Sequence, residues 1–354
     1  MRRIAVSFVV VVFLAMASSF ALAAQRTFVS GVGSDSNACS LLAPCRSLTA
    51  ALVNTAVNGE IIIQDSAGYG PVTIAQSVSI VAPPGVYGGI SIASGTGITI
   101  NGAGINVTLK GLTITGQGGA TGIDFQAGAR LRVESVEFAN LTGNGLIVAG
   151  GNAETLVIDS ILRDIGGAGI VVQGAATMTL DRVRFDRTGM AIDAGDGAVV
   201  HITDSRMANS TGVGARFSTL ASGGSIRVSM DNCSITDATF EAVNLTTLGS
   251  SSTIDLTISR SSLVGNQNGV GVNAPGASSA ATATLTDNVI SKNSNKGVYV
   301  QFAGATAILS GNTVTGNVTG LQSLSSGVLT SFGNNSVTGN GNNTSPPPSI
   351  VPGI

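Results

Sequence analysis

The chain of 354 residues has no Trp, a single His, three Cys, and few charged or aromatic side chains, which make up 10% and 4% of the sequence. With so few Cys and His residues, no cluster has the spacing of a zinc site. One His among many Ser residues gives no Ser-His-Asp pattern typical of a catalytic triad. The shortage of aromatic side chains leaves a long polysaccharide groove poorly supplied with flat surfaces for sugar rings.

Positive charge is also scarce. The formal net charge is −2, and the sequence contains no basic stripe interleaved with aromatic residues. Nucleic acids and anionic membrane surfaces are usually bound by such stripes, so we expect neither as a partner. The 48 glycines recur at turns of a repeat and do not precede a helical pattern, which argues against a phosphate-binding loop.

What fills the chain instead is a repeat of 22 to 28 residues between residues 107 and 340. Repeats of this length are typical of solenoids, because each unit is too small to bury its own core and packs on its neighbours. We therefore expect one solenoid domain. The ten units align on their last apolar residue at Ile114, Phe138, Leu162, Phe185, Met207, Ile235, Leu263, Ile290, Val314 and Val337.

Each unit alternates apolar and polar residues with the period of a β-strand. A second short strand follows a corner, and a third begins at a Gly followed by an apolar residue. Three strands per coil predict a three-faced solenoid with three parallel sheets, its coils stacked at about 4.8 Å. An entirely apolar column, five residues before the alignment position, is predicted to point inward: Leu109, Val133, Val157, Leu180, Ile202, Met230, Ile258, Leu285, Leu309 and Phe332.

The corner after this first strand holds small or amide residues in most units. Asn tolerates the left-handed backbone of a sharp corner, and stacked amides can hydrogen-bond to one another, so an Asn ladder is predicted in the last three units. Cys233 in the same column is interpreted as a small buried residue and not as a reactive thiol. The column includes Ser160, Ser205, Cys233, Ser261, Asn288, Asn312 and Asn335, whereas Asn266, Asn293, Asn317 and Asn340 are interpreted as marking the next turn.

These features resemble the right-handed parallel β-helix of the pectin-lyase-like superfamily. The pattern L-x-x-N-x-I/V-x-x-N-x-x-x-G-I/V is present at residues 285–298, and the stretch from Thr27 through Cys39 to Cys45 is similar to the start of secreted bacterial proteins with right-handed β-helix repeats. The resemblance implies the fold and an exported location. The Gly-His-Gly and paired-Asp signatures of polygalacturonases and the Arg-x-Pro-x-x-Arg segment of pectate lyases are missing, so it implies no particular reaction.

Four segments are expected along the chain. Residues 1–24 have the features of a secretory signal peptide, namely Arg2 and Arg3, an apolar run over residues 4–16 and a small-residue cleavage site. The apolar run is shorter than the roughly 20 residues of a membrane-spanning helix, so we expect a secreted or periplasmic protein without a transmembrane segment in the mature chain. Residues 25–60 form an N-terminal cap, residues 61–340 the parallel β-helix, and residues 341–354 a disordered tail with too few apolar residues to bury.

The expected cap contains two cysteines and an amphipathic helix. Cys39 and Cys45 lie close together in an exported chain, which favours a disulfide in an oxidising compartment. Residues 47–57 have helical spacing of apolar side chains, with Ser47 as the N-cap. Such a helix would cover the first coil, whose open strand edges would otherwise recruit other chains.

The candidate chemistry lies at the first corner. Five successive units carry a carboxylate there, at Glu134, Asp159, Asp181, Asp204 and Asp231, with arginines and the sole histidine nearby. Carboxylates on adjacent coils are close enough to act as an acid and base pair or to bind Ca²⁺. The catalytic candidates are Asp181, Asp204, Arg182 and His201, and the Ca²⁺ candidates are Asp159, Asp181 and Asp204. The competing interpretation is that these Asp residues are ordinary turn residues in water and that a lone exposed His is incidental.

Two hypotheses follow from these residues. The first, which we favour, is a secreted non-catalytic β-solenoid with a structural, surface or glycan-contacting role, monomeric and without a cofactor. Its expected partner is an extracellular polysaccharide or a cell-surface component. The alternative is a polysaccharide lyase or glycoside hydrolase that uses the acidic corner, with Ca²⁺ as a cofactor only in the lyase case.

Overall fold

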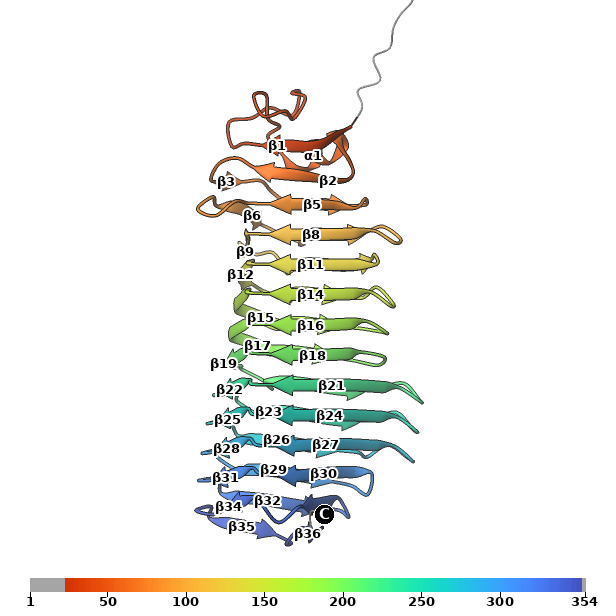
Figure 1. Cartoon of the computed structure of the whole chain (residues 1–354), viewed down its shortest axis with the longest axis vertical. Coiled ribbons are helices and arrows are strands. Elements are labelled where there is room, and N and C mark those ends of the chain that lie inside the picture. Colours follow the sequence, from red (N-terminus) through yellow and green to blue (C-terminus); the bar gives the residue numbers. More distant parts are fainter. Residues whose placement is uncertain (1–22, 352–354) are drawn as a thin grey trace, which may run out of the picture.

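The computed structural model describes residues 23–351 as an all-β parallel solenoid, which confirms the fold predicted from the repeat (Figure 1). The expected signal peptide lies almost wholly outside the described residues. Most coils contribute one strand to a 14-stranded sheet, here called the first face, and two strands to a 22-stranded sheet, called the second and third faces in chain order. Within the described range no helix is long and apolar enough to cross a membrane.

The first face contains the longest regular column of strands. In order it consists of β1 (Ala24–Val29), β2 (Thr55–Ile63), β5 (Val78–Val81), β8 (Asn106–Lys110), β11 (Arg130–Glu134), β14 (Glu154–Ile158), β16 (Thr177–Asp181), β18 (Val199–Thr203), β21 (Ser225–Asp231), β24 (Thr253–Ser259), β27 (Ala280–Thr286), β30 (Ala305–Ser310), β33 (Val328–Ser331) and β36 (Ser349–Ile350).

The second and third faces are joined into one sheet because β15 and β17 run through the corner between them, whereas three separate sheets were expected. The second face consists of β3 (Ala67–Gly68), β6 (Gly88–Ile92), β9 (Leu112–Gly116), β12 (Glu137–Leu141), the first parts of β15 (Ile161–Val172) and β17 (Arg184–Ala194), β19 (Arg206–Ala208), β22 (Ser234–Thr236), β25 (Ser262–Val264), β28 (Val289–Ser291), β31 (Thr313–Thr315) and β34 (Ser336–Val337). The third face consists of β4 (Val72–Ile74), β7 (Thr96–Asn101), β10 (Thr121–Ala127), β13 (Leu146–Val148), the ends of β15 and β17, β20 (Ala215–Thr219), β23 (Glu241–Thr247), β26 (Asn268–Asn273), β29 (Lys296–Gln301), β32 (Thr319–Leu324) and β35 (Asn342–Ser345).

The inward column of the first face follows the predicted register up to the last unit. Leu109 pairs with Val133 and Val133 with Val157, and all three side chains are buried. In the last unit Ser331 pairs with Leu309, and Phe332 is 41% exposed, so the prediction that Phe332 points inward is wrong. The corner of that unit has one residue more than the preceding one, and a shift of one residue turns a side chain to the opposite face.

The predicted Asn ladder is present, and a second one runs beside it. At the first corner, Asn288 Nδ2 donates to Asn312 Oδ1 at 3.0 Å, and Asn312 Nδ2 donates to Asn335 Oδ1 at 2.9 Å. At the second corner the same contacts link the residues interpreted as turn markers: Asn266, Asn293, Asn317 and Asn340. These corner residues are mostly buried, so the second series stabilises the interior as the first does.

Small residues complete the corners where the ladders stop. The hydroxyl of Ser261 accepts a hydrogen bond from the backbone N–H of Cys233 at 3.0 Å, the role that an amide oxygen plays in the later coils. Cys233 is buried as predicted, and burial raises the pKa of its thiol to about 11. At the start of the third-face strands, a Cβ on Gly145 would lie 2.4 Å from the carbonyl oxygen of Gly169 on the next coil, so only glycine fits.

The N-terminal region contains the predicted disulfide and helix. Cys39 and Cys45 are bonded to each other. Helix α1 (Leu48–Asn54) begins at Ser47, whose hydroxyl accepts from the backbone N–H of Ala50 at 3.2 Å, and it ends earlier than expected because β2 starts at Thr55. Leu48 and Ala51 are buried in the core, and α1 lies beside the first strands (Figure 1).

The C-terminal segment differs from the disordered tail that we expected. β35 pairs with β32, and β36 pairs with β33, both in parallel. A strand pairs through its backbone groups, so a segment with few apolar side chains can still extend a sheet whose edge is already in place.

Candidate functional site

The carboxylates of the first corner occupy two different positions on successive coils. Glu134, Asp181 and Asp231 are the last residues of β11, β16 and β21. Asp159 and Asp204 stand one position later, where the backbone is left-handed with φ of 49° in both. Asp is one of the few side chains that tolerate this conformation, which supports the turn-residue interpretation of Asp159 and Asp204.

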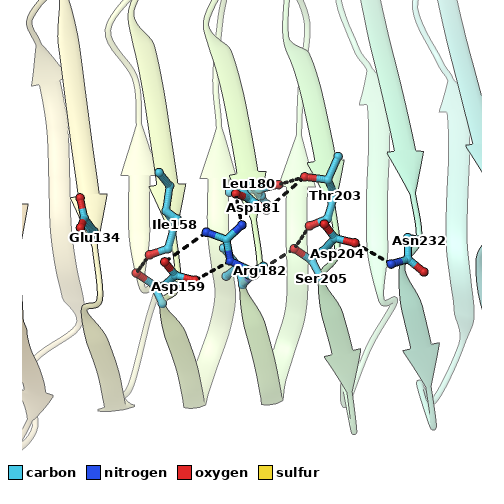
Figure 2. A network of polar contacts seen from close by, with 12 residues as sticks. Glu134, Ile158, Asp159, Leu180, Asp181, Arg182, Thr203, Asp204, Ser205 and Asn232 are labelled. Atoms are coloured by element: carbon cyan, nitrogen blue, oxygen red, sulfur yellow. Dashed lines mark hydrogen bonds and ion pairs between the residues drawn. The ribbon is translucent and has the colours of Figure 1, made fainter.

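Arg182 separates the central carboxylates (Figure 2). Its Nε and Nη2 donate to the two oxygens of Asp159 at 2.7 and 3.2 Å, and its Nη1 donates to Asp181 at 2.5 Å. Asn232 donates to Asp204 at 2.5 Å from the opposite side. The hydrogen bonds from Arg182 lower the pKa of Asp159, against an opposing effect of desolvation. Arg182 therefore supplies the positive charge that a Ca²⁺ ion shared by Asp159 and Asp181 would bring.

The outer carboxylates of the corner are paired in the same way. Lys110 and Arg132 contact Glu134 at 2.8 and 2.7 Å, and their hydrogen bonds lower the pKa of Glu134. Asp231 accepts from Ser259 at 2.7 Å and forms an ion pair with Arg260. A general acid at neutral pH needs a raised pKa, so Glu134 and Asp159 are poorly suited to donate a proton.

His201 is separate from this network. It lies on β18, and a hydrogen bond of 2.7 Å joins its Nδ1 to Ser229 on the neighbouring strand β21. Its side chain is exposed, and no hydrogen bond connects it to Asp181 or Asp204 among the residues that the structure describes. The four catalytic candidates therefore share a surface but do not converge on one point. Residues 23–351 contain no group of three or more His, Cys, Asp or Glu side chains placed to hold a metal ion.

A different feature lies on the second face, where a concavity of about 460 Å³ opens between β12 and β19. Arg184 and Arg206 line it and are direct neighbours in the register of β17 and β19. Both side chains are exposed, and neither forms an ion pair with any side chain of the described range. The positive charge of this concavity is thus available to a ligand.

The other charged groups of the concavity neutralise one another. Arg163 contacts Glu137 at 2.7 Å and Asp164 at 3.1 Å. Asp186 forms an ion pair with Arg187 and accepts from Asn209 at 2.7 Å. The arginine pair formed by Arg184 and Arg206 was not singled out as a site from the sequence. The sequence nevertheless contains a signal for this pair, because both arginines immediately precede the alignment residue in adjacent units.

Comparisons with known proteins agree with this architecture. The family model described as "Right handed beta helix region" matches residues 96–258 and 189–341. The A-module of the mannuronan C-5 epimerase AlgE4 of Azotobacter vinelandii superposes with a TM-score of 0.60 at 16% identity, covering 83% of this chain and 91% of that one. The periplasmic alginate epimerase AlgG gives a TM-score of 0.56 at 11% identity, covering 77% of this chain and 65% of that one. No curated protein matches the chain. At these identities the similarity concerns the fold.

Proposed function

The chain belongs to the right-handed β-helix family, and from this premise we propose that it is a non-catalytic protein that binds an acidic polysaccharide through Arg184 and Arg206. The observation that carries the proposal is the placement of two like charges on adjacent strands, neither of which forms an ion pair within residues 23–351. Strands in a sheet lie about 4.8 Å apart, and like charges directly opposite each other are destabilising. An anionic ligand would relieve this repulsion.

The chemistry of the arginine pair fits carboxylate or sulfate groups. A guanidinium group donates two parallel hydrogen bonds to such an anion, and it loses less hydration than an ammonium group does. Because Arg184 and Arg206 are stacked along the solenoid, they suit a polymer that carries one anionic group after another along the same direction. Two of the proteins with a similar fold are a mannuronan epimerase and an alginate epimerase, and both of these polysaccharides carry carboxylate groups along the chain.

A binding role, as opposed to a catalytic one, is also favoured by the hydrogen bonding of the carboxylates at the acidic corner. Each of its carboxylates accepts a hydrogen bond from Arg, Lys or Asn, and the pKa of Asp159 and Glu134 is lowered by these contacts. An exported location, which the Cys39–Cys45 disulfide favours, would bring the chain to extracellular polysaccharides.

The binding proposal is tested by titrating the purified chain with alginate, polygalacturonate and a neutral glucan in a calorimeter. We expect the two acidic polymers to bind and the neutral one not to bind. The double substitution Arg184→Gln and Arg206→Gln should weaken binding by about 100-fold or more, since each charge-assisted contact contributes about 1.5–3 kcal/mol. Rising salt should weaken binding to the unsubstituted chain.

The matched control removes two exposed arginines elsewhere, through Arg130→Gln and Arg227→Gln on the first face. This variant has the same net charge as the test variant and should keep its affinity. Equal losses in both variants would show that only the overall charge matters. Tight binding of the neutral glucan would also contradict the proposal.

Catalysis is tested by a separate measurement. Incubating the chain with the same polysaccharides, with and without Ca²⁺, should give no new reducing ends and no unsaturated products. The lyase or hydrolase alternative instead requires such products, and it requires them to disappear in the Asp204→Ala variant while the fold stays intact. Product formation of this kind would replace the binding proposal by an enzymatic one.

A further inference from the structure

The C-terminal end of the solenoid carries no charged side chain. Lys296 at the start of β29 is the last Asp, Glu, Lys, Arg or His of the sequence. The coils from β30 to β36 are therefore built from uncharged residues only. Natural sheets usually protect their exposed edges with charged side chains, above all Lys, so the absence of charge at this end needs an explanation.

The same end presents open strand edges. β34, β35 and β36 pair with β31, β32 and β33, and within residues 23–351 no strand pairs with their outer edges. The second Asn ladder ends there as well, because Asn340 Nδ2 donates to Asn343 of its own coil at 3.1 Å and not to a further coil. Apolar side chains are exposed beside these edges, with Phe332 at 41% and Ile350 at 61%.

The opposite end of the solenoid is different. Helix α1 and the loop with the Cys39–Cys45 disulfide lie beside the first strands (Figure 1), and Arg26 and Glu60 form an ion pair between β1 and β2. The first coil therefore offers a covered and charged surface to an incoming edge. This arrangement disfavours head-to-tail stacking, which would otherwise produce open filaments.

One of the three final strands is better suited to pairing than the others. β36 is only two residues long, and the residue before it, Pro348, has no backbone N–H to offer to a further strand. β34 is also two residues long. β35, with four residues and no charge or proline, is the longest unprotected edge.

We infer that two copies of the chain associate end to end through the outer edge of β35. A twofold axis places the two β35 strands antiparallel, and both copies then contribute the same surface. Because this surface has no charged side chain, two identical ends meet without like-charge repulsion. The exposed Phe332 and Ile350 lie at the same end and add apolar area. The inferred dimer is an alternative to the monomer that we expected from the sequence.

The test is the molar mass of the purified chain, measured by sedimentation equilibrium over a wide range of concentration. We expect the mass to rise from one chain to two. Substituting Asn342→Lys together with Ser345→Lys places two positive charges on each copy of β35, and like charges facing each other should weaken the dimer by about tenfold or more. If the double variant loses the β-sheet circular dichroism of the unsubstituted chain, the single Asn342→Lys variant at an exposed position takes its place.

The control adds the same charge to the middle of the solenoid through Ser225→Lys and Thr253→Lys, two exposed neighbours on β21 and β24. It should dimerise like the unsubstituted chain. A mass of one chain at every concentration would overturn the inference. A dimer that survives the β35 substitutions would overturn it too, since association would then use another surface.

Discussion

At the scale of single residues, the amide of Asn293 is predicted to contribute strongly to stability. Its Oδ1 accepts from the backbone and side chain of Asn266 at 3.0 and 3.2 Å, and its Nδ2 donates to the Leu263 carbonyl at 3.3 Å and to Asn317 at 2.9 Å. Asn293→Ala would remove the side-chain partners of the buried Asn266 backbone N–H and of the Leu263 carbonyl, at a cost of about 1–3 kcal/mol for each orphaned group. We expect the free energy of unfolding in urea to fall by about 2–4 kcal/mol in total.

Asn106→Ala provides the matched control for this substitution, because Asn106 is an exposed residue at the start of β8. Exposed positions usually change stability by less than about 0.5 kcal/mol. If Asn293→Ala lowers the free energy of unfolding by no more than Asn106→Ala does, the second ladder does not stabilise the corner. Hydrogen exchange then distinguishes a local effect from a global one, since repeat proteins open coil by coil.

At the scale of strands and corners, the features that depend on the periodicity of the repeat could be predicted from the sequence. The inward column was correct from Leu109 to Leu309 because alternate residues of a strand must face the core or the solvent. It failed at Phe332, where one extra residue in the corner shifts the register. The second Asn ladder was missed because an Asn after a strand looks the same in sequence whether it marks an exposed turn or a buried amide. The strands β35 and β36 were missed because their pairing depends on an edge that other coils provide.

The candidate site was predictable only in part for a related reason. The repeat placed five carboxylates at one corner, and the structure keeps them there. Sequence could not indicate that Arg182 reaches both Asp159 and Asp181, because that depends on the rotamer of a long side chain. Nor could it show that Arg184 and Arg206 have no ionic partner in the part of the chain that the structure describes. This follows because Arg163 and Arg187 form ion pairs with the nearby carboxylates.

At the scale of the whole molecule, the paired carboxylates predict how stability depends on acid. Hydrogen bonds from Lys110 and Arg132 lower the pKa of Glu134, the hydrogen bond from Arg187 lowers that of Asp164, and those from Ser30 and Tyr69 lower that of Asp65. The unfolded chain therefore binds more protons than the folded chain when these groups titrate. The stabilisation is fully present above the unfolded-state pKa of about 4 and is lost as the pH falls below it.

In alkaline solution the dependence of folding stability on pH has the opposite sign. Burial, assisted by the charge of Glu241, raises the pKa of Tyr299 to about 12, so its contribution is present below the unfolded-state value of about 10 and is lost as the pH rises towards 12. Melting temperatures measured from pH 2 to pH 12 should therefore form a plateau between about pH 5 and 9, with a fall on each side. Glu134→Gln should reduce the fall in melting temperature at acid pH and leave the alkaline part of the profile unchanged. Tyr299→Phe should reduce the fall at alkaline pH and leave the acid part unchanged. A steady decline through the neutral range would contradict this prediction.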